Sequence, residues 1–189
     1  MVRNIRGHRI RWGVLAAQGA RVGIWSALAM LVVAMLTVPL FSSGLDSWSF
    51  TKIIAAYFMG DSAASPVTGL DAGPVLVGTC IHLAIGALVG VSFAAIIGMF
   101  DLEGWTPVAL VGLMYGALLF VGSATVIAAG VGPADTYDLP MAPLLWGNVI
   151  FGLVAGVLMA AWADAADLDQ PEEERVRVFE TTGAPSDSR

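Results

Sequence analysis

The amino-acid sequence predicts an all-α membrane protein with four transmembrane helices and one amphipathic helix in an external loop. Of the 189 residues, 57% are hydrophobic and only 13% are charged, whereas an ordinary soluble domain is about 25% charged. Four apolar runs are long enough to cross about 30 Å of hydrocarbon, which takes about 20 helical residues. The basic residues are also concentrated at the two ends of the chain.

The four apolar runs define the expected spans of a transmembrane domain that covers residues 22–163. No Asp, Glu, Lys or Arg lies inside any of them. The first run follows an arginine-rich start, but at about 20 residues it is longer than the roughly 7–15 apolar residues of a signal peptide, so we expect it to remain a span. The predicted spans are residues 22–41, 74–100, 105–130 and 141–163.

The lysines and arginines predict the orientation of the spans. Residues 1–21 form a basic arm with five arginines and no acidic residue, and the polar tail 164–189 carries eight acidic residues and three arginines. Because cytoplasmic segments are enriched in Lys and Arg, both termini are expected in the cytoplasm, with the connections 42–73 and 131–140 outside. The expected location is the inner (plasma) membrane of a bacterium.

The first external loop, residues 42–73, contains a candidate amphipathic helix. Within residues 46–60, aromatic and branched side chains recur at helical spacing on one face, and two polar side chains lie opposite them. We expect this helix to lie in the outer membrane interface or to cap the helix bundle. The apolar face consists of Phe50, Ile53, Ile54, Tyr57 and Phe58, and the polar face carries Ser49 and Lys52.

Spans two and four share one sequence pattern, in which a proline is followed by His or Asn and then by two regularly spaced glycines. The pattern predicts two helical hairpins, residues 22–100 and 105–163, related by duplication. Each hairpin starts and ends on the same side of the membrane, so the repeats are parallel, unlike the inverted repeats of many transporters. The matching residues are Pro74, His82, Gly86 and Gly90 in span two and Pro140, Asn148, Gly152 and Gly156 in span four.

Glycines spaced four residues apart lie along one ridge of a helix and leave a shallow groove there. Another helix backbone approaches such a groove closely and gains van der Waals contact inside the membrane. We expect spans two and four to pack against each other along these ridges and to form the centre of the domain. The predicted packing residues are Gly78, Gly86, Gly90, Gly112, Gly116, Gly152 and Gly156.

His82 and Asn148 are the candidate ligand-binding or polar-contact residues. His82 lies on the glycine ridge of span two, so its side chain should face protein, and Asn148 lies at the same depth in the other repeat. If spans two and four pack together, the two side chains meet near the centre of the bundle. An ionisable group in a span marks a functional site by default, but an interhelical hydrogen bond that fixes the helix register would also place a histidine there. Proton or ligand handling and metal or haem ligation are the other two interpretations of His82.

Several absences exclude common activities. The sequence contains no phosphate-binding loop, dinucleotide-binding glycine pattern, HExxH motif or GxSxG motif, so we expect no enzymatic activity and no catalytic residue. The other histidine, His8, lies in the basic arm, which excludes a haem held by two histidines within the membrane. We therefore expect neither a cofactor nor a metal site. The arginines of residues 1–21 fit a topology signal and lipid-headgroup contact, so nucleic acid is not an expected partner.

The order of these features resembles a group of bacterial four-span inner-membrane proteins, of which the YagU-like family is one. The resemblance covers about residues 19–163 and implies a four-span fold but no particular activity. In the YagU-like family a histidine follows a glycine in span four, whereas Asn148 stands at that position here, so a role that requires two histidines is not implied. The residues that carry the resemblance are Gly19, Gly23, Asp46, Ile81, His82, Leu139, Pro140, Gly147 and Asn148.

Together these features favour a non-catalytic accessory or scaffolding subunit of a larger bacterial membrane complex, respiratory or photosynthetic, with the lipid bilayer and other membrane-protein subunits as partners. Two alternatives are a small-solute or proton carrier that uses His82 and Asn148, and a protein that contacts a haem or a quinone. The packing of the helices discriminates between the first two. Glycine grooves filled by the chain's own helices favour the subunit, and a hydrated gap between spans two and four favours the carrier.

Overall fold

The computed structural model describes residues 12–129 and 139–168, and for residues 163–168 it describes the backbone alone. The predictions made for residues 1–11, for most of the connection 131–140 and for the tail beyond residue 168 lie outside this part of the chain. All regular secondary structure within the described part is helical. The helices are α1 (Trp12–Phe41), α2 (Ser49–Met59), the short 3-10 helix η1 (Asp61–Ala64), α3 (Ala72–Phe100), α4 (Trp105–Ala128) and α5 (Met141–Leu168).

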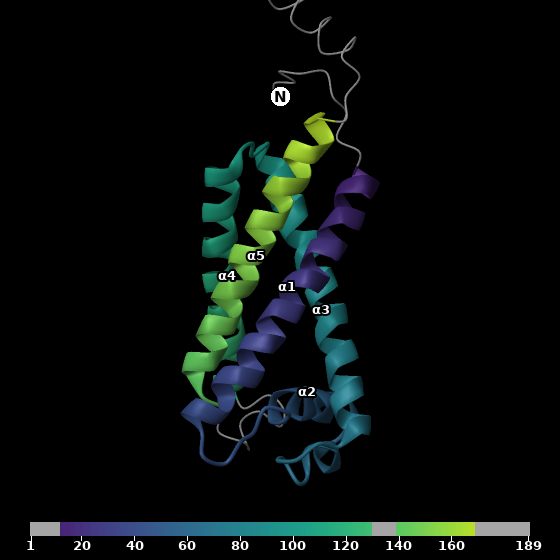
Figure 1. Cartoon of the computed structure of the whole chain (residues 1–189), viewed down its shortest axis with the longest axis vertical. Coiled ribbons are helices and arrows are strands. Elements are labelled where there is room, and N and C mark those ends of the chain that lie inside the picture. Colours follow the sequence, from purple (N-terminus) through teal and green to yellow (C-terminus); the bar gives the residue numbers. More distant parts are fainter. Residues whose placement is uncertain (1–11, 130–138, 169–189) are drawn as a thin grey trace, which may run out of the picture.

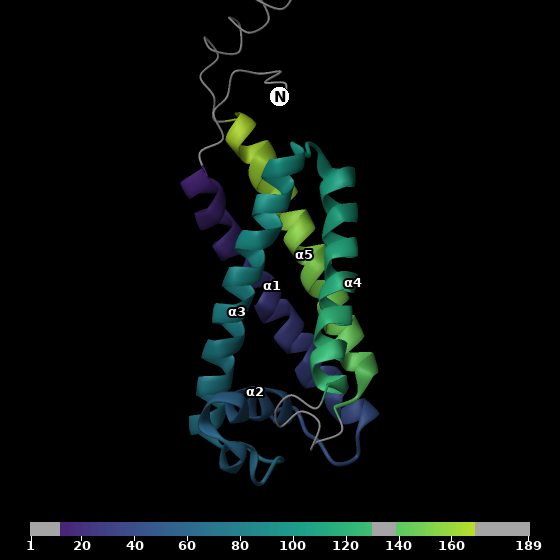
Figure 2. The same ribbon diagram turned by 180° about the vertical axis from the view of Figure 1, so that it is seen from behind.

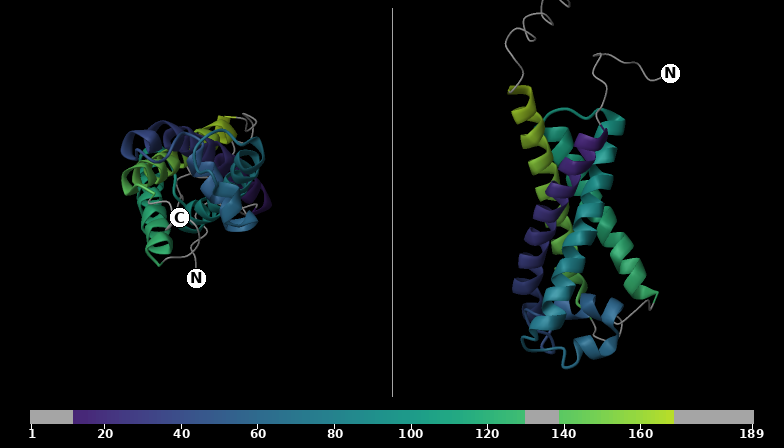
Figure 3. Two further views of the ribbon diagram at one scale, coloured as in Figure 1. Left: turned by 90° about the horizontal axis from the view of Figure 1, so that it is seen from below. Right: turned by 90° about the vertical axis from the view of Figure 1, so that its right-hand side faces the viewer.

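The four long helices run side by side along the long axis of the molecule, and α2 crosses one end of them (Figure 1, Figure 2). The start of α1 and the end of α5 lie at the opposite end, which we call the terminal end, in contrast to the α2 end. The helices pack in the order α3, α1, α5, α4. Although the turn 101–104 joins α3 to α4, these helices diverge toward the α2 end and share few contacts (Figure 3).

Each of the four long helices is long and apolar enough to cross a membrane, with a mean hydropathy between 2.0 and 2.3 over the spanning window. The predicted fold class, an all-α membrane protein with four spans, is therefore confirmed. Helix α1 starts at Trp12 rather than at residue 22, so the second half of the predicted basic arm is helical. This extension is compatible with a bilayer because Arg21 is exposed and a side chain as long as that of arginine reaches the polar interface from within a span.

Two aspartates delimit α3. At its start the Asp71 carboxylate accepts a hydrogen bond of 3.3 Å from the N–H of Gly73 and thereby caps the helix. At its end Asp101 adopts the left-handed conformation with φ of 49°, and Gly104 follows with φ of 87°. Glycine adopts such positive φ angles at little steric cost, so the chain reverses within this short turn and starts α4.

The first hairpin is held together by a glycine seam between α1 and α3. Gly19 and Gly23 of α1 face Gly86 and Gly90 of α3 at backbone contact. A Cβ atom on Gly90 would lie only 2.5 Å from the Cα atom of Gly23 and 2.7 Å from its nitrogen. The two helices are therefore closer than any larger side chain at these positions would allow.

The second hairpin contains an equivalent seam between α4 and α5. Gly112 and Gly116 of α4 face Gly152 and Gly156 of α5, and a Cβ atom on Gly152 would lie 2.7 Å from the nitrogen of Gly116. The two glycines of the shared sequence pattern thus pack on the preceding helix in both hairpins. This agreement supports the predicted parallel repeat.

The prediction that spans two and four pack on each other is wrong. These spans are α3 and α5, which share few contacts, whereas α1 packs extensively on α3, and α4 on α5. The reason is that each glycine ridge finds a matching small-residue ridge on its own hairpin partner, which the chain already holds nearby. The hairpins join through α1 and α5, where the Met30 side chain packs against Gly147.

The candidate amphipathic helix is present as α2, but burial in the structure does not follow its two predicted faces. Ser49 and Lys52, expected on the outer polar face, are fully buried. Phe58, expected on the inner apolar face, is 68% exposed, and Tyr57 is also exposed. The physical reason is that residues 66–69 fold back over the polar face of α2 and provide hydrogen-bond acceptors there. Helix α2 packs mainly on α3 and caps that end of the bundle.

Candidate functional site

His82 lies in α3 and is 8% exposed, so its side chain faces protein. Its Nε2 atom lies 3.1 Å from the carbonyl oxygen of Ala27 in α1. Because a carbonyl oxygen only accepts hydrogen bonds, Nε2 carries the proton and donates it. The Phe50 ring of α2 contacts the imidazole in an edge-to-face arrangement, with the ring centroids 5.6 Å apart and the planes inclined by 80°. His82 therefore connects three helices.

Asn148 is 4% exposed and lies in the seam of the second hairpin. Its side-chain amide donates a hydrogen bond of 2.8 Å to the carbonyl oxygen of Leu144, one turn earlier in its own helix. Asn148 and His82 do not hydrogen-bond to each other. The expectation that they meet is wrong because it depended on α3 packing against α5. Each residue instead belongs to its own hairpin.

Gly78 positions α2 above His82. Unlike the other predicted packing glycines, it contacts α2 rather than a spanning helix. A Cβ atom on Gly78 would collide with the carbonyl group of Thr51 and lie 3.3 Å from the nitrogen of Ala55. The missing side chain lets α2 lie directly on α3, and this brings Phe50, in the first turn of α2, against the imidazole of His82.

A strap formed by residues 66–69 holds α2 in this place through the buried Lys52. The ammonium group of Lys52 donates hydrogen bonds to the carbonyl oxygens of Pro66, Thr68 and Gly69. The side chain is 1% exposed, and a buried ammonium group is tolerated only when its charge is well solvated by such partners. This burial was not predictable from the sequence, because a lysine on a helix is usually exposed.

Asp46 holds the same strap from the other side. Its carboxylate accepts hydrogen bonds from the Gly69 N–H at 2.5 Å, from the Ser49 hydroxyl at 2.9 Å, and from the N–H groups of Trp48 and Ser49, both at 3.0 Å. Burial by itself raises the pKa of Asp46, but the hydrogen bonds from Gly69, Ser49 and Trp48 outweigh it and lower the pKa below its ordinary value of 3.8.

We expect acidification to loosen the strap. The lowered pKa means that the ionised Asp46 stabilises the fold above its unfolded pKa of about 3.9, and that this stabilisation is lost as the pH falls through the folded pKa. The amide proton of Gly69 should therefore exchange faster as the pH falls below about 4, after correction for intrinsic exchange. In the Asp46→Asn variant this pH dependence should disappear. A corrected Gly69 exchange rate that is constant through acid titration of the unmodified protein would contradict the role given to Asp46.

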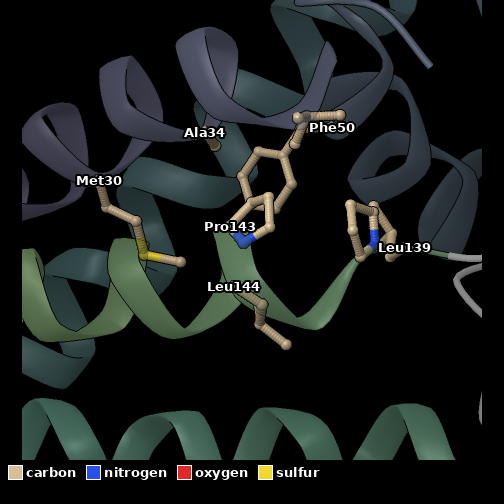
Figure 4. A pocket seen from close by; sticks show the side chains of 8 residues that line it. Met30, Ala34, Phe50, Leu139, Pro143 and Leu144 are labelled. Carbon is tan, nitrogen blue, oxygen red and sulfur yellow. The ribbon is translucent and has the colours of Figure 1, made fainter. Parts of the chain in front are cut away.

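A small apolar pocket lies at the α2 end between α1, α2 and α5 (Figure 4). Its free volume of about 10 Å³ is at the lower limit for one water molecule. All of its lining side chains are apolar, and a pocket of this kind stays dry. Phe50 belongs to this lining and also contacts His82. The lining residues are Met30, Ala34, Val38, Phe50, Leu139, Pro140, Pro143 and Leu144.

Tyr115, in the middle of α4, links this helix to α3. Its hydroxyl lies 2.6 Å from the Ser92 hydroxyl and donates to the carbonyl oxygen of Val89 at 3.1 Å. Its ring also packs on Phe93, with the centroids 5.3 Å apart. Tyr115 was not among the predicted site residues, although a hydroxyl group within an apolar run was a signal present in the sequence.

No metal centre is found in the part of the chain that the structure describes, because it holds no group of three His, Cys, Asp or Glu side chains close enough to share an ion. Cys80 lies two residues before His82 but is exposed on another face of α3. Among the described residues, His82 therefore belongs to no such group, and its ring neighbour is Phe50.

The four apolar spans and the two glycine seams define the class of the protein, a multi-pass helical membrane protein. No family model matches the chain, and neither a curated protein nor a solved structure matches it. The resemblance to the YagU-like family therefore stays a prediction. His82 and Asn148 stay candidate site residues, but each lies in a different hairpin and has its own contacts.

Proposed function

We propose that this protein is a non-catalytic accessory or scaffolding subunit of a larger assembly in a bacterial inner membrane, with both termini in the cytoplasm. The observation that carries the proposal is the filling of the glycine grooves by the chain's own helices. Gly86 and Gly90 pack on α1, and Gly152 and Gly156 pack on α4. A rigid bundle of this kind offers its outer faces to lipid and to partner subunits.

The polar side chains within the spans support the same function, because many of them are bonded to backbone carbonyl groups of this chain. His82 bonds to α1, and five hydroxyl groups and one amide bond to the residue four positions earlier in their own helices. Because the donors of these side chains are used in bonds within the bundle, they favour a packing role over a path for a solute. The five hydroxyls and the amide belong to Ser26, Thr37, Thr79, Ser123, Thr125 and Asn148.

Helix α4 has the smallest buried share of the four spanning helices. Of its residues, all of which the structure describes, Val108, Gly112 and Gly116 are buried. The remaining apolar side chains include Met114, which is 72% exposed, and Leu118. A spanning helix of which so small a share is buried in its own chain is covered by lipid or by another membrane protein, as the proposed function requires.

The proposal is tested by the native mass of the protein. We expect the chain, tagged after Arg189 and extracted gently from its own membrane, to migrate with a much larger assembly. A photo-reactive amino acid in place of Met114 should cross-link to a protein of that assembly. Migration as a particle of one or two chains, with cross-links to lipid alone, would contradict the subunit function.

The carrier function makes the opposite prediction for the polar residues. For an accessory subunit, we expect His82→Ala to lower thermal stability modestly, because the variant loses one interhelical hydrogen bond worth roughly 0.6–2 kcal/mol. Assembly should persist, and proton or solute flux in reconstituted vesicles should equal that of vesicles containing unmodified protein. A flux that depends strictly on His82 or Asn148, measured with the fold intact, would favour the carrier.

A further inference from the structure

Phe50 contacts both His82 and the apolar pocket. Its ring is one wall of the pocket, together with Met30 of α1 and Leu144 of α5 (Figure 4). The same ring makes the edge-to-face contact with the imidazole of His82. Helix α2 therefore contributes an aromatic ring that contacts both the apolar lining of the pocket and the imidazole of His82.

The imidazole has one hydrogen-bonding position that remains open. The Nε2 proton of His82 is donated to Ala27, so Nδ1 of the neutral ring carries a lone pair and acts as an acceptor. Among the residues that the structure describes, the hydrogen bond from Nε2 to Ala27 is the only one found for the His82 side chain. A buried acceptor without a donor is unfavourable by about 1–3 kcal/mol, and a bound hydroxyl group would remove that cost.

We propose that the place taken by the Phe50 ring is a binding site for the hydroxyl-bearing aromatic ring of a membrane-soluble molecule, such as a phenol or a hydroquinone. The ligand's ring replaces that of Phe50 against the apolar lining, and its hydroxyl donates to Nδ1 of His82. The site selects a donor, because the proton on Nε2 is already committed to Ala27. The oxidised quinone, which carries no hydroxyl donor, is therefore a poorer ligand than its hydroquinone.

Phe50 keeps this site closed in the structure. The free volume of the pocket is too small for an aromatic ring, so the Phe50 side chain must leave before a ligand enters. Phe50 belongs to the first turn of α2, which the strap holds through Asp46 and Lys52. Binding is therefore linked to a movement of α2 or of the Phe50 side chain. The inference goes beyond the proposed subunit function and does not depend on a partner.

The test uses 4-propylphenol and its methyl ether, 4-propylanisole, which has the same ring and tail but no donor. The purified full-length chain is labelled with ¹⁵N-histidine, and its two histidines give few signals, which the His82→Phe variant assigns. We expect 4-propylphenol to shift the Nδ1 resonance of His82, and 4-propylanisole to leave it in place. In Phe50→Ala, where the space is open, 4-propylphenol should bind at least about tenfold more tightly, because no ring has to be displaced.

Folding is checked in every variant by its helical circular dichroism and its elution volume, and Phe50→Val replaces Phe50→Ala if the latter does not fold. The His82→Phe variant keeps an aromatic ring but lacks the acceptor, so it should bind the two probes equally. The proposal is overturned if 4-propylphenol leaves Nδ1 of His82 unshifted in the folded Phe50 variant. It is also overturned if 4-propylanisole produces the same shift, since Nδ1 would then not receive a hydrogen bond.

Discussion

Replacing Gly90 or Gly152 by alanine is expected to destabilise the protein, although alanine favours a helix more than glycine does. A single methyl group on Gly90 would lie 2.5 Å from the Cα atom of Gly23, and one on Gly152 would lie 2.8 Å from that of Gly116. The helices must move apart to accept it, and overpacking of this kind costs about 1–3 kcal/mol. Both variants should therefore unfold at a clearly lower temperature in detergent.

The matched control is Gly122→Ala in α4, where a Cβ atom meets nothing within 4 Å. At this position the substitution should keep or raise the unfolding temperature, because alanine is favoured over glycine in a helix by up to about 1 kcal/mol. The same chemical change thus has opposite effects at packed and open positions. Equal unfolding temperatures for the Gly90, Gly152 and Gly122 variants would show that the two seams do not hold the bundle.

The second large effect is expected for Lys52→Met. Methionine has a similar length but no ammonium group, so the carbonyl oxygens of Pro66, Thr68 and Gly69 lose their shared donor. An unsatisfied buried acceptor costs about 1–3 kcal/mol. The strap avoids this cost if residues 66–69 detach from α2. We therefore expect hydrogen–deuterium exchange of residues 66–69 to become much faster and the unfolding temperature to fall.

Phe58→Met is the control for the Lys52 variant because it introduces the same residue into the same helix. Phe58 is 68% exposed, so its replacement should leave the exchange of the strap and the unfolding temperature nearly unchanged. If Lys52→Met also left the exchange of residues 66–69 unchanged, the buried ammonium group would have no part in fastening the strap.

The strap and the seams have different consequences for function. The seams set the distances between the spanning helices and leave the outer surface of the bundle for lipid and partners. The strap sets the position of α2 and thereby keeps Phe50 against His82. Weakening the strap with Lys52→Met should therefore increase access to the proposed aromatic site, whereas Gly152→Ala alters the hairpin that does not contain His82.

The four spans were predictable from the sequence alone because each one satisfies a local condition. A run of about 20 apolar residues without a charge has no other stable place than the hydrocarbon core, whatever its neighbours are. The glycine ridges were equally visible as sites of close helix contact. Span ends were less predictable, as the early start of α1 at Trp12 shows, because a helix continues into the interface when its polar side chains reach water.

The sequence by itself determined the class of the protein, the number of spans and the identity of the residues that pack closely. Only the tertiary structure decided which ridge meets which, since a glycine groove accepts any small-residue surface and the choice depends on all four helices together. For that reason His82 pairs with Ala27 and Phe50 rather than with Asn148. The burial of Lys52 was also decided by tertiary structure, because a strap distant in sequence supplies the carbonyl oxygens that surround its charge.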